Sequence, residues 1–142
     1  MLIGGKDEAE SVDYLNKKSL IDKRMVIHVN DSDIIQTLKN MSLCDVVLSA
    51  ECGFAHMADA VGAKTVVYKT VTDTEVFGPF SKIIFAISAN ISCKYCLGTE
   101  RYNTCKTEEC VSFFSSDMLV KEILKYTDWM RGNLLKTFNM PY

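Results

Sequence analysis

The sequence predicts an α/β domain whose core is a parallel β-sheet flanked by helices. Residues 44–50 form an apolar run typical of a buried strand, residues 53–63 a helix of small side chains, and residues 64–70 a strand rich in β-branched residues. A strand, helix and strand within about 30 residues form a parallel βαβ unit with a right-handed crossover. The 142 residues are 48% hydrophobic and 24% charged, which is typical of one globular domain over residues 1–142.

The elements ahead of this unit follow from short apolar runs and turn residues. We expect a strand over residues 1–5 that ends in a Gly-Gly turn, a helix over 7–20, and a strand over 25–29. The turn at residues 30–32 supplies a cap, Asp31 or Ser32, for a helix that continues through Met41. A strand at the very start of the chain suggests that the first half of a longer protein, its N-terminal domain, is absent from this sequence.

Three further segments complete the expected order. Residues 83–87 supply another strand, and residues 92–110 form a Cys-rich, irregular loop. A terminal helix begins at Ser116, and its packing side is expected to carry Leu119, Ile123, Leu124 and Trp129. The α/β core therefore comprises residues 1–91 and 111–135.

Composition and charge exclude several classes of function. The net charge of −2 gives no electrostatic reason to expect a nucleic acid as partner. No apolar run approaches the roughly 20 residues that span a bilayer, and the first ten residues lack the pattern of a secretory signal. Six cysteines without an export signal favour a reducing compartment, so we expect a cytoplasmic protein.

The end of the strand over residues 44–50 carries a candidate phosphate site. Glu51, Cys52 and Gly53 lie where ligands bind in open α/β sheets, and Gly53 leaves room for a phosphate near the backbone. The following helix presents its first amides and its positive dipole end, and His56 adds a hydrogen bond or a charge. Glu51 is better suited to a hydroxyl than to a phosphate. The same residues are explained equally simply without a ligand: Gly53 then only allows the turn from strand to helix, and His56 has a structural role.

The same segment resembles the signature of glycosyltransferase family 9, the lipopolysaccharide heptosyltransferases. In that family a strand ends in Asp-Ser/Thr-Gly, and a histidine follows after two further residues; here residues 51–56 read Glu-Cys-Gly-Phe-Ala-His. Residues 4–8, Gly-Gly-Lys-Asp-Glu, resemble the family's Gly-x-x-x-Glu, while Thr72-Asp73 and Gly78-Pro79 fall where the family has matching loops. The resemblance covers most of the chain.

The resemblance implies a Rossmann-like fold, the C-terminal half of a GT-B enzyme, which binds a nucleotide-sugar donor. Gly53 and His56 would hold the donor diphosphate, with His56 stabilising the leaving group and the amides of Phe54 and Ala55 contributing. Cys52 and Glu51 take the place of the family's hydroxyl and aspartate. Other donor contacts implied by the resemblance are a ribose contact from Glu8 and a cleft wall from Thr72 and Asp73.

Family members are inverting transferases that need no cofactor for catalysis, and their general base comes from the N-terminal domain. The resemblance therefore implies a fragment that is inactive alone. The implied donor is ADP-heptose, and the implied acceptor is a glycan or a lipid-linked sugar of lipopolysaccharide biosynthesis at the inner membrane face, with peripheral membrane contact.

Two other functions fit the same residues. One is a different GT-B enzyme, such as a UDP- or GDP-sugar transferase or a sugar-nucleotide epimerase. The other is a degenerate, non-catalytic binding module, because Glu51, Cys52, Thr70 and Val71 depart from the family's pattern.

The Cys-rich loop is a candidate metal site. Cys93, Cys96, Cys105 and Cys110 follow the spacing C-x2-C-x8-C-x4-C, and four thiolates in an irregular loop are able to bind a structural zinc or iron ion. Free thiols and disulfides remain the alternatives at this stage.

Overall fold

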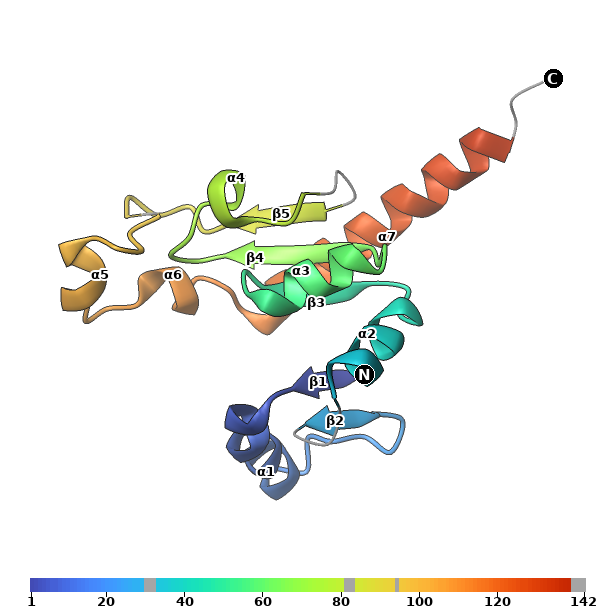
Figure 1. Cartoon of the computed structure of the whole chain (residues 1–142), viewed down its shortest axis with the longest axis horizontal. Helices are drawn as coiled ribbons and strands as arrows, with labels where there is room; N and C mark the ends of the chain where they lie inside the picture. Colours follow the sequence, from blue (N-terminus) through green and yellow to red (C-terminus); the bar gives the residue numbers. More distant parts are fainter. Residues whose placement is uncertain (30–32, 81–83, 94, 139–142) are drawn as a thin grey trace. The chain divides into compact units, whose positions relative to one another are not determined.

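The computed structural model describes residues 1–29, 33–80, 84–93 and 95–138 (Figure 1). Contacts divide the chain into two compact units, Met1–Asn40 and Met41–Tyr142, and each is described by itself. The sequence prediction of one domain over residues 1–142 stays a prediction.

The first unit contains a small parallel sheet. Strand β1 (Leu2–Gly4) pairs with β2 (Ile27–Val29), with Leu2 opposite Ile27. The connection between the strands contains the short 3-10 helix η1 (Lys6–Glu8) and helix α1 (Ala9–Lys17). This strand–helix–strand order confirms the sequence interpretation of the chain's first 29 residues.

Helix α2 (Ile34–Ser42) begins with a side-chain cap. The carboxylate of Asp33 accepts a hydrogen bond of 2.8 Å from the amide of Gln36, the pattern of an N-cap residue and the third residue of its helix. Asp31 and Ser32, the caps expected from the sequence, lie outside the described residues. The sequence therefore predicts the capping chemistry, but the residue that provides it is Asp33.

The second unit is built on a three-stranded parallel sheet in the order β3-β4-β5. Its strands are β3 (Val47–Ala50), β4 (Thr65–Lys69) and β5 (Ile84–Ser88), and helix α3 (Gly53–Ala60) connects the first two. Gly62 ends α3 in the left-handed region with a φ of 70°, which a residue with a Cβ rarely adopts. The predicted βαβ unit is thus confirmed.

Helices cover both faces of this sheet. Alternate residues of a strand point to opposite faces, so Thr65 and Val67 share one face of β4 and Val66 the other. All three are fully buried. Val66 packs with Ile87 and with Tyr126 of helix α7 (Ser116–Phe138). Helix α3, which contacts β3 and β4 through buried alanines, covers the opposite face (Figure 1). The fold is mixed α/β with parallel sheets flanked by helices.

The remaining helices are short, and some sequence expectations are corrected there. The loop expected to be irregular over residues 92–110 contains α5 (Glu100–Thr104) and the start of α6 (Glu109–Ser112), and α4 (Thr74–Phe77) follows β4. On α7, Leu119 and Ile123 pack against the core as expected. Leu124 does not, because its side chain is 56% exposed, and the Trp129 side chain lies outside the described residues. Among the helices of the described residues, none has the length and apolar character needed to cross a membrane.

Candidate functional site

The junction between β3 and α3 presents a helix start whose side-chain cap is missing. Cys52 is the N-cap residue of α3 and is extended, with φ −156° and ψ −176°, but its side chain makes no capping hydrogen bond. The Cys52 sulfur lies 3.6 Å from the Ser49 hydroxyl instead. The amide of Ala55 donates to the Cys52 carbonyl at 3.0 Å, so this amide is already engaged. The amide of Phe54, in the first turn of the helix, is the better-placed donor for an anion.

Gly53, the first residue of α3, faces open space. Apart from its chain neighbours and the backbone of its own helix, a Cβ built on Gly53 would meet no atom within 4 Å, so neither neighbouring packing nor an unusual backbone conformation requires glycine here. The absence of a side chain leaves the backbone at the helix start open to a ligand. This is the geometry expected if a phosphate approaches the chain at Gly53.

Glu51 directly follows β3, and only one of its two carboxylate oxygens has a hydrogen-bond partner among the described residues. One carboxylate oxygen, Oε2, accepts a hydrogen bond from the Thr72 hydroxyl. The other, Oε1, is buried and has no hydrogen-bond partner among the described residues. Burial raises the pKa of Glu51 above its ordinary value; the nearby Asp73 raises it further, while Lys69 and His56 lower it. A buried carboxylate oxygen without a partner is costly unless a donor reaches it, and a ligand hydroxyl is such a donor.

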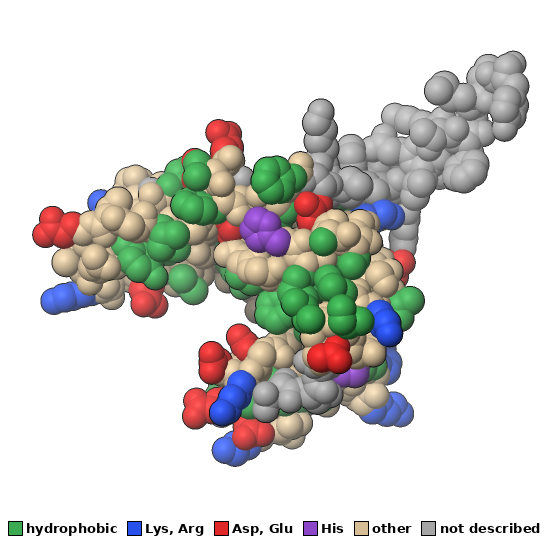
Figure 2. Space-filling model, viewed as in Figure 1, with side chains coloured by type: hydrophobic (Ala, Val, Ile, Leu, Met, Phe, Trp, Pro, Cys, Tyr) green, Lys and Arg blue, Asp and Glu red, His purple; other side chains and the backbone are tan. Residues whose placement is uncertain are grey.

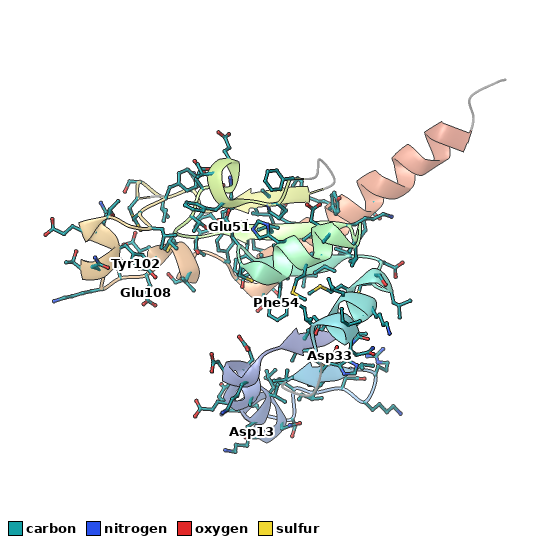
Figure 3. The ribbon with its side chains drawn as sticks, in the orientation of Figure 1. Asp13, Asp33, Glu51, Phe54, Tyr102 and Glu108 are labelled. Atoms are coloured by element: carbon teal, nitrogen blue, oxygen red, sulfur yellow. The ribbon has the colours of Figure 1, made fainter. Side chains whose placement is uncertain are left out.

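The loop after β4 reaches Glu51, which is labelled in Figure 3, through a side-chain hydrogen bond. Thr72 and Asp73 lie in this loop, and the Thr72 hydroxyl reaches Glu51 at the end of β3. Asp73 begins helix α4, since its carboxylate accepts from the Glu75 amide at 3.0 Å and its carbonyl accepts from the Phe77 amide at 2.8 Å. The carboxyl ends of two neighbouring parallel strands therefore meet at Glu51 and Thr72, where α/β sheets bind ligands.

His56 connects α3 to α4 by a long-range hydrogen bond. Its ring nitrogen Nε2 lies 2.9 Å from the carbonyl oxygen of Phe77. A carbonyl only accepts, so Nε2 carries the proton in this contact. The second nitrogen, Nδ1, is then an acceptor in the neutral ring. His56 donates to a phosphate only if both ring nitrogens are protonated or the Phe77 contact opens.

The structure thus brings most of the predicted site residues to one edge of the sheet. Glu51 and Thr72 are bonded to each other, Asp73 follows in the same loop, and the others lie at the β3–α3 junction, namely Cys52, Gly53, Phe54, Ala55 and His56. Lys69, at the end of β4, was missed, although its charge lowers the pKa of Glu51. A basic residue at the carboxyl end of a parallel strand was the available signal.

Glu8, the predicted ribose contact, belongs to the first unit. Its side chain packs over Gly4, where a built Cβ would stand only 2.9 Å from the Glu8 Cβ. The Gly4-Gly5 turn is therefore explained locally, because Glu8 occupies the space that a side chain at Gly4 would need. The role of Glu8 toward a ribose stays a prediction.

The four predicted metal-ligating cysteines line one cavity in the second unit, with a volume of about 440 Å³. In the part of the chain that the structure describes, no group of three or more His, Cys, Asp or Glu side chains is arranged to hold a metal ion.

Charged side chains of both signs are interspersed on the face shown in Figure 2.

Comparisons with known proteins add nothing to this site. No family model, curated protein or solved structure matches the chain. A functional assignment therefore depends on the residues and their geometry.

Proposed function

We propose that this chain is the donor-binding half of a GT-B glycosyltransferase similar to family 9, and that it binds a nucleoside diphosphate sugar at the β3–α3 junction. The observation that carries the proposal is the buried, unpartnered Oε1 of Glu51, among the described residues, beside the open helix start at Gly53. The first feature calls for a hydrogen-bond donor, which a ligand hydroxyl supplies, and the second accepts an anion. A nucleotide sugar offers hydroxyls and a diphosphate within one molecule.

The diphosphate is assigned to the start of α3. The positive end of the helix dipole and the first-turn amides favour an anion, and Gly53 places no Cβ in its way. Cys52 gives these amides no side-chain cap, so a ligand oxygen does not have to displace one. The eight residues of α3 are supported by the buried side chains of Ala55 and Ala58.

Glu51 is assigned to a hydroxyl of the ribose or the sugar. An ionised carboxylate only accepts hydrogen bonds, and Thr72 already occupies one of its oxygens. A ligand hydroxyl that donates to Oε1 would give both carboxylate oxygens a hydrogen-bond partner and remove the cost of the unpartnered atom.

In the proposed glycosyl transfer, negative charge develops on the leaving diphosphate. An acceptor hydroxyl attacks the anomeric carbon of the donor with inversion, the bond from that carbon to the diphosphate breaks, and the diphosphate leaves with the electron pair. His56, once its contact with the Phe77 carbonyl opens, and the first amides of α3 would stabilise that charge. The base that takes the acceptor's proton is assigned to the N-terminal half of such an enzyme. ADP-heptose is the proposed donor and a glycan or lipid-linked sugar the acceptor, at the cytoplasmic membrane face.

A non-catalytic binding module is the second candidate. The specific observation in its favour is that His56, the residue assigned to the leaving group, already donates to the Phe77 carbonyl. Such a module would bind nucleotides and transfer nothing even with an acceptor domain present. A UDP- or GDP-sugar enzyme differs instead in the base that it prefers.

Calorimetric titration of the chain with ADP, UDP and GDP tests the proposal. We expect one nucleotide to bind best and the substitution Gly53→Ala to abolish the heat, because the new Cβ occupies the phosphate position. The fold should persist, since that Cβ meets no protein atom. Ala60→Ser, on the exposed far end of the same helix, is the matched control. Equal binding by wild type and Gly53→Ala would refute the site.

A further inference from the structure

The segment between β5 and α7 gathers four of the chain's six cysteines around one cavity. None of the six cysteines, all of which lie within the described residues, forms a disulfide. The cavity of about 440 Å³ is lined by Thr70 and Val71, which follow β4, and by four cysteines, namely Cys93, Cys96, Cys105 and Cys110. Figure 3 shows Tyr102 and Glu108, which also line it, on the same segment. Thiols from both cysteine pairs therefore line the same space.

This segment has no apolar core of its own. Every side chain from residue 99 to residue 109 is exposed, and Cys110 is the first buried one after them. Helices α5 and α6 have five and four residues, and helices this short do not persist without support. Burial of apolar side chains therefore contributes little to holding residues 99–109 in place, and a metal-mediated cross-link would supply such support.

The backbone between the cysteines adopts uncommon conformations. Tyr95, between Cys93 and Cys96, has a φ of 57°, and Glu108, two residues before Cys110, has a φ of 46°. Residues with a Cβ rarely occupy the left-handed region unless their surroundings hold them there. Both residues lie within the short intervals that separate the paired cysteines.

We propose that Cys93, Cys96, Cys105 and Cys110 form a tetrahedral thiolate site for one structural Zn²⁺ ion. Two closely spaced pairs separated by a short loop are typical of structural zinc sites, as are four thiolate ligands. Among the described residues the four sulfurs line the cavity but are not arranged to hold an ion. Binding therefore has to draw them together, and each thiol releases its proton to solvent as the Zn–S bond forms.

The site would also brace the loop after β4. The amide of Leu97, next to Cys96, donates to the carbonyl of Val71 at 3.0 Å. The Lys69 ammonium lies 5.5 Å from the centre of the Tyr95 ring. These two contacts connect the first cysteine pair to the end of β4. An ion bound by that pair would therefore also restrain the loop after β4.

The test uses the full chain, stripped of metal with a chelator under reducing conditions and titrated with Co²⁺. We expect one equivalent to bind, with sulfur-to-cobalt charge-transfer absorption and tetrahedral d–d bands, and Zn²⁺ to displace it. In the Zn²⁺ form a thiol reagent should reach Cys44 and Cys52 and leave the four cluster cysteines protected. Hydrogen exchange at the Leu97 amide should slow when Zn²⁺ binds. The absence of a saturable thiolate band in the wild type would overturn the proposal.

Cys105→Ser is the informative variant, because Cys105 is exposed and its replacement places little demand on folding. Its Co²⁺ affinity should fall by more than about 100-fold, since even residues behind metal ligands contribute roughly 10–100-fold. Cys44→Ser, the same change outside the cavity, should keep wild-type affinity. Unchanged Co²⁺ affinity in a folded Cys105→Ser protein would contradict the assignment. If this variant does not fold, wild-type stoichiometry and thiol protection decide the matter.

Discussion

Replacing Thr72 with valine should destabilise the protein by removing the one donor that the described residues offer to the Glu51 carboxylate. Valine keeps the shape of threonine but removes the hydroxyl that donates to Glu51 Oε2. Among the described residues, Oε1 has no partner to compensate. A hydrogen bond to a charged group contributes about 1.5–3 kcal/mol. Both side chains are half-buried, so water screens the contact, and we expect a loss near about 1.5 kcal/mol, the lower end of that range.

The sign of the pH dependence follows from the raised pKa of Glu51. Folding favours the protonated carboxyl, so ionisation of Glu51 lowers the free energy of unfolding. This loss is absent below the unfolded pKa of about 4.3 and grows as pH rises through the folded pKa. Thr72→Val should raise that folded pKa further. The stability difference between variant and wild type should therefore be small below about pH 4 and full at neutral pH.

The assay is urea unfolding in a double-mutant cycle with Glu51→Gln. The amide that replaces the carboxylate is neutral, so Thr72→Val should cost less in that background, and the remaining cost should not vary with pH. The coupling energy at neutral pH should be about 1 kcal/mol. Equal costs of Thr72→Val in both backgrounds, at every pH, would refute the contact between the two side chains.

Three further substitutions test the packing that positions the site. Gly62→Ala should lower the free energy of unfolding by about 1 kcal/mol, because the left-handed φ of 70° disfavours a Cβ; an unchanged urea midpoint would argue against this helix end. Val66→Ala should cost about 2 kcal/mol, since the side chain is fully buried between β4 and α7; a cost near zero in thermal unfolding would place Val66 outside the core. Gly4→Ala should increase amide exchange in β1, because its Cβ collides with Glu8, whereas unchanged exchange would contradict that packing.

Much of the fold was predictable because its signals are local. The apolar runs around Val47 and Val66, and the glycine at position 62, suffice to predict β3, β4 and the end of α3. Leu124 was misassigned to the packing side of α7, where Tyr126 takes that place. Helical periodicity gives a stripe of candidate positions, and contact with the sheet decides which of them are buried.

The candidate site was less predictable because its decisive contacts are long-range. Glu51 and Gly53 were found from their place after a strand, which depends only on neighbouring residues. The bond from Thr72 to Glu51 and that from His56 to Phe77 each join residues 21 positions apart. Such pairs form only when β3 and β4 are aligned in register, and no periodicity within either segment encodes them.

The most direct test of the nucleotide site is amide chemical-shift mapping of the full chain during titration with ADP, UDP and GDP. We expect saturable shifts for the amides of Gly53 and Phe54, with smaller ones at Thr72, for the preferred nucleotide. Saturable shifts confined to other parts of the chain, with Gly53 and Phe54 unmoved, would contradict a donor site at the start of α3.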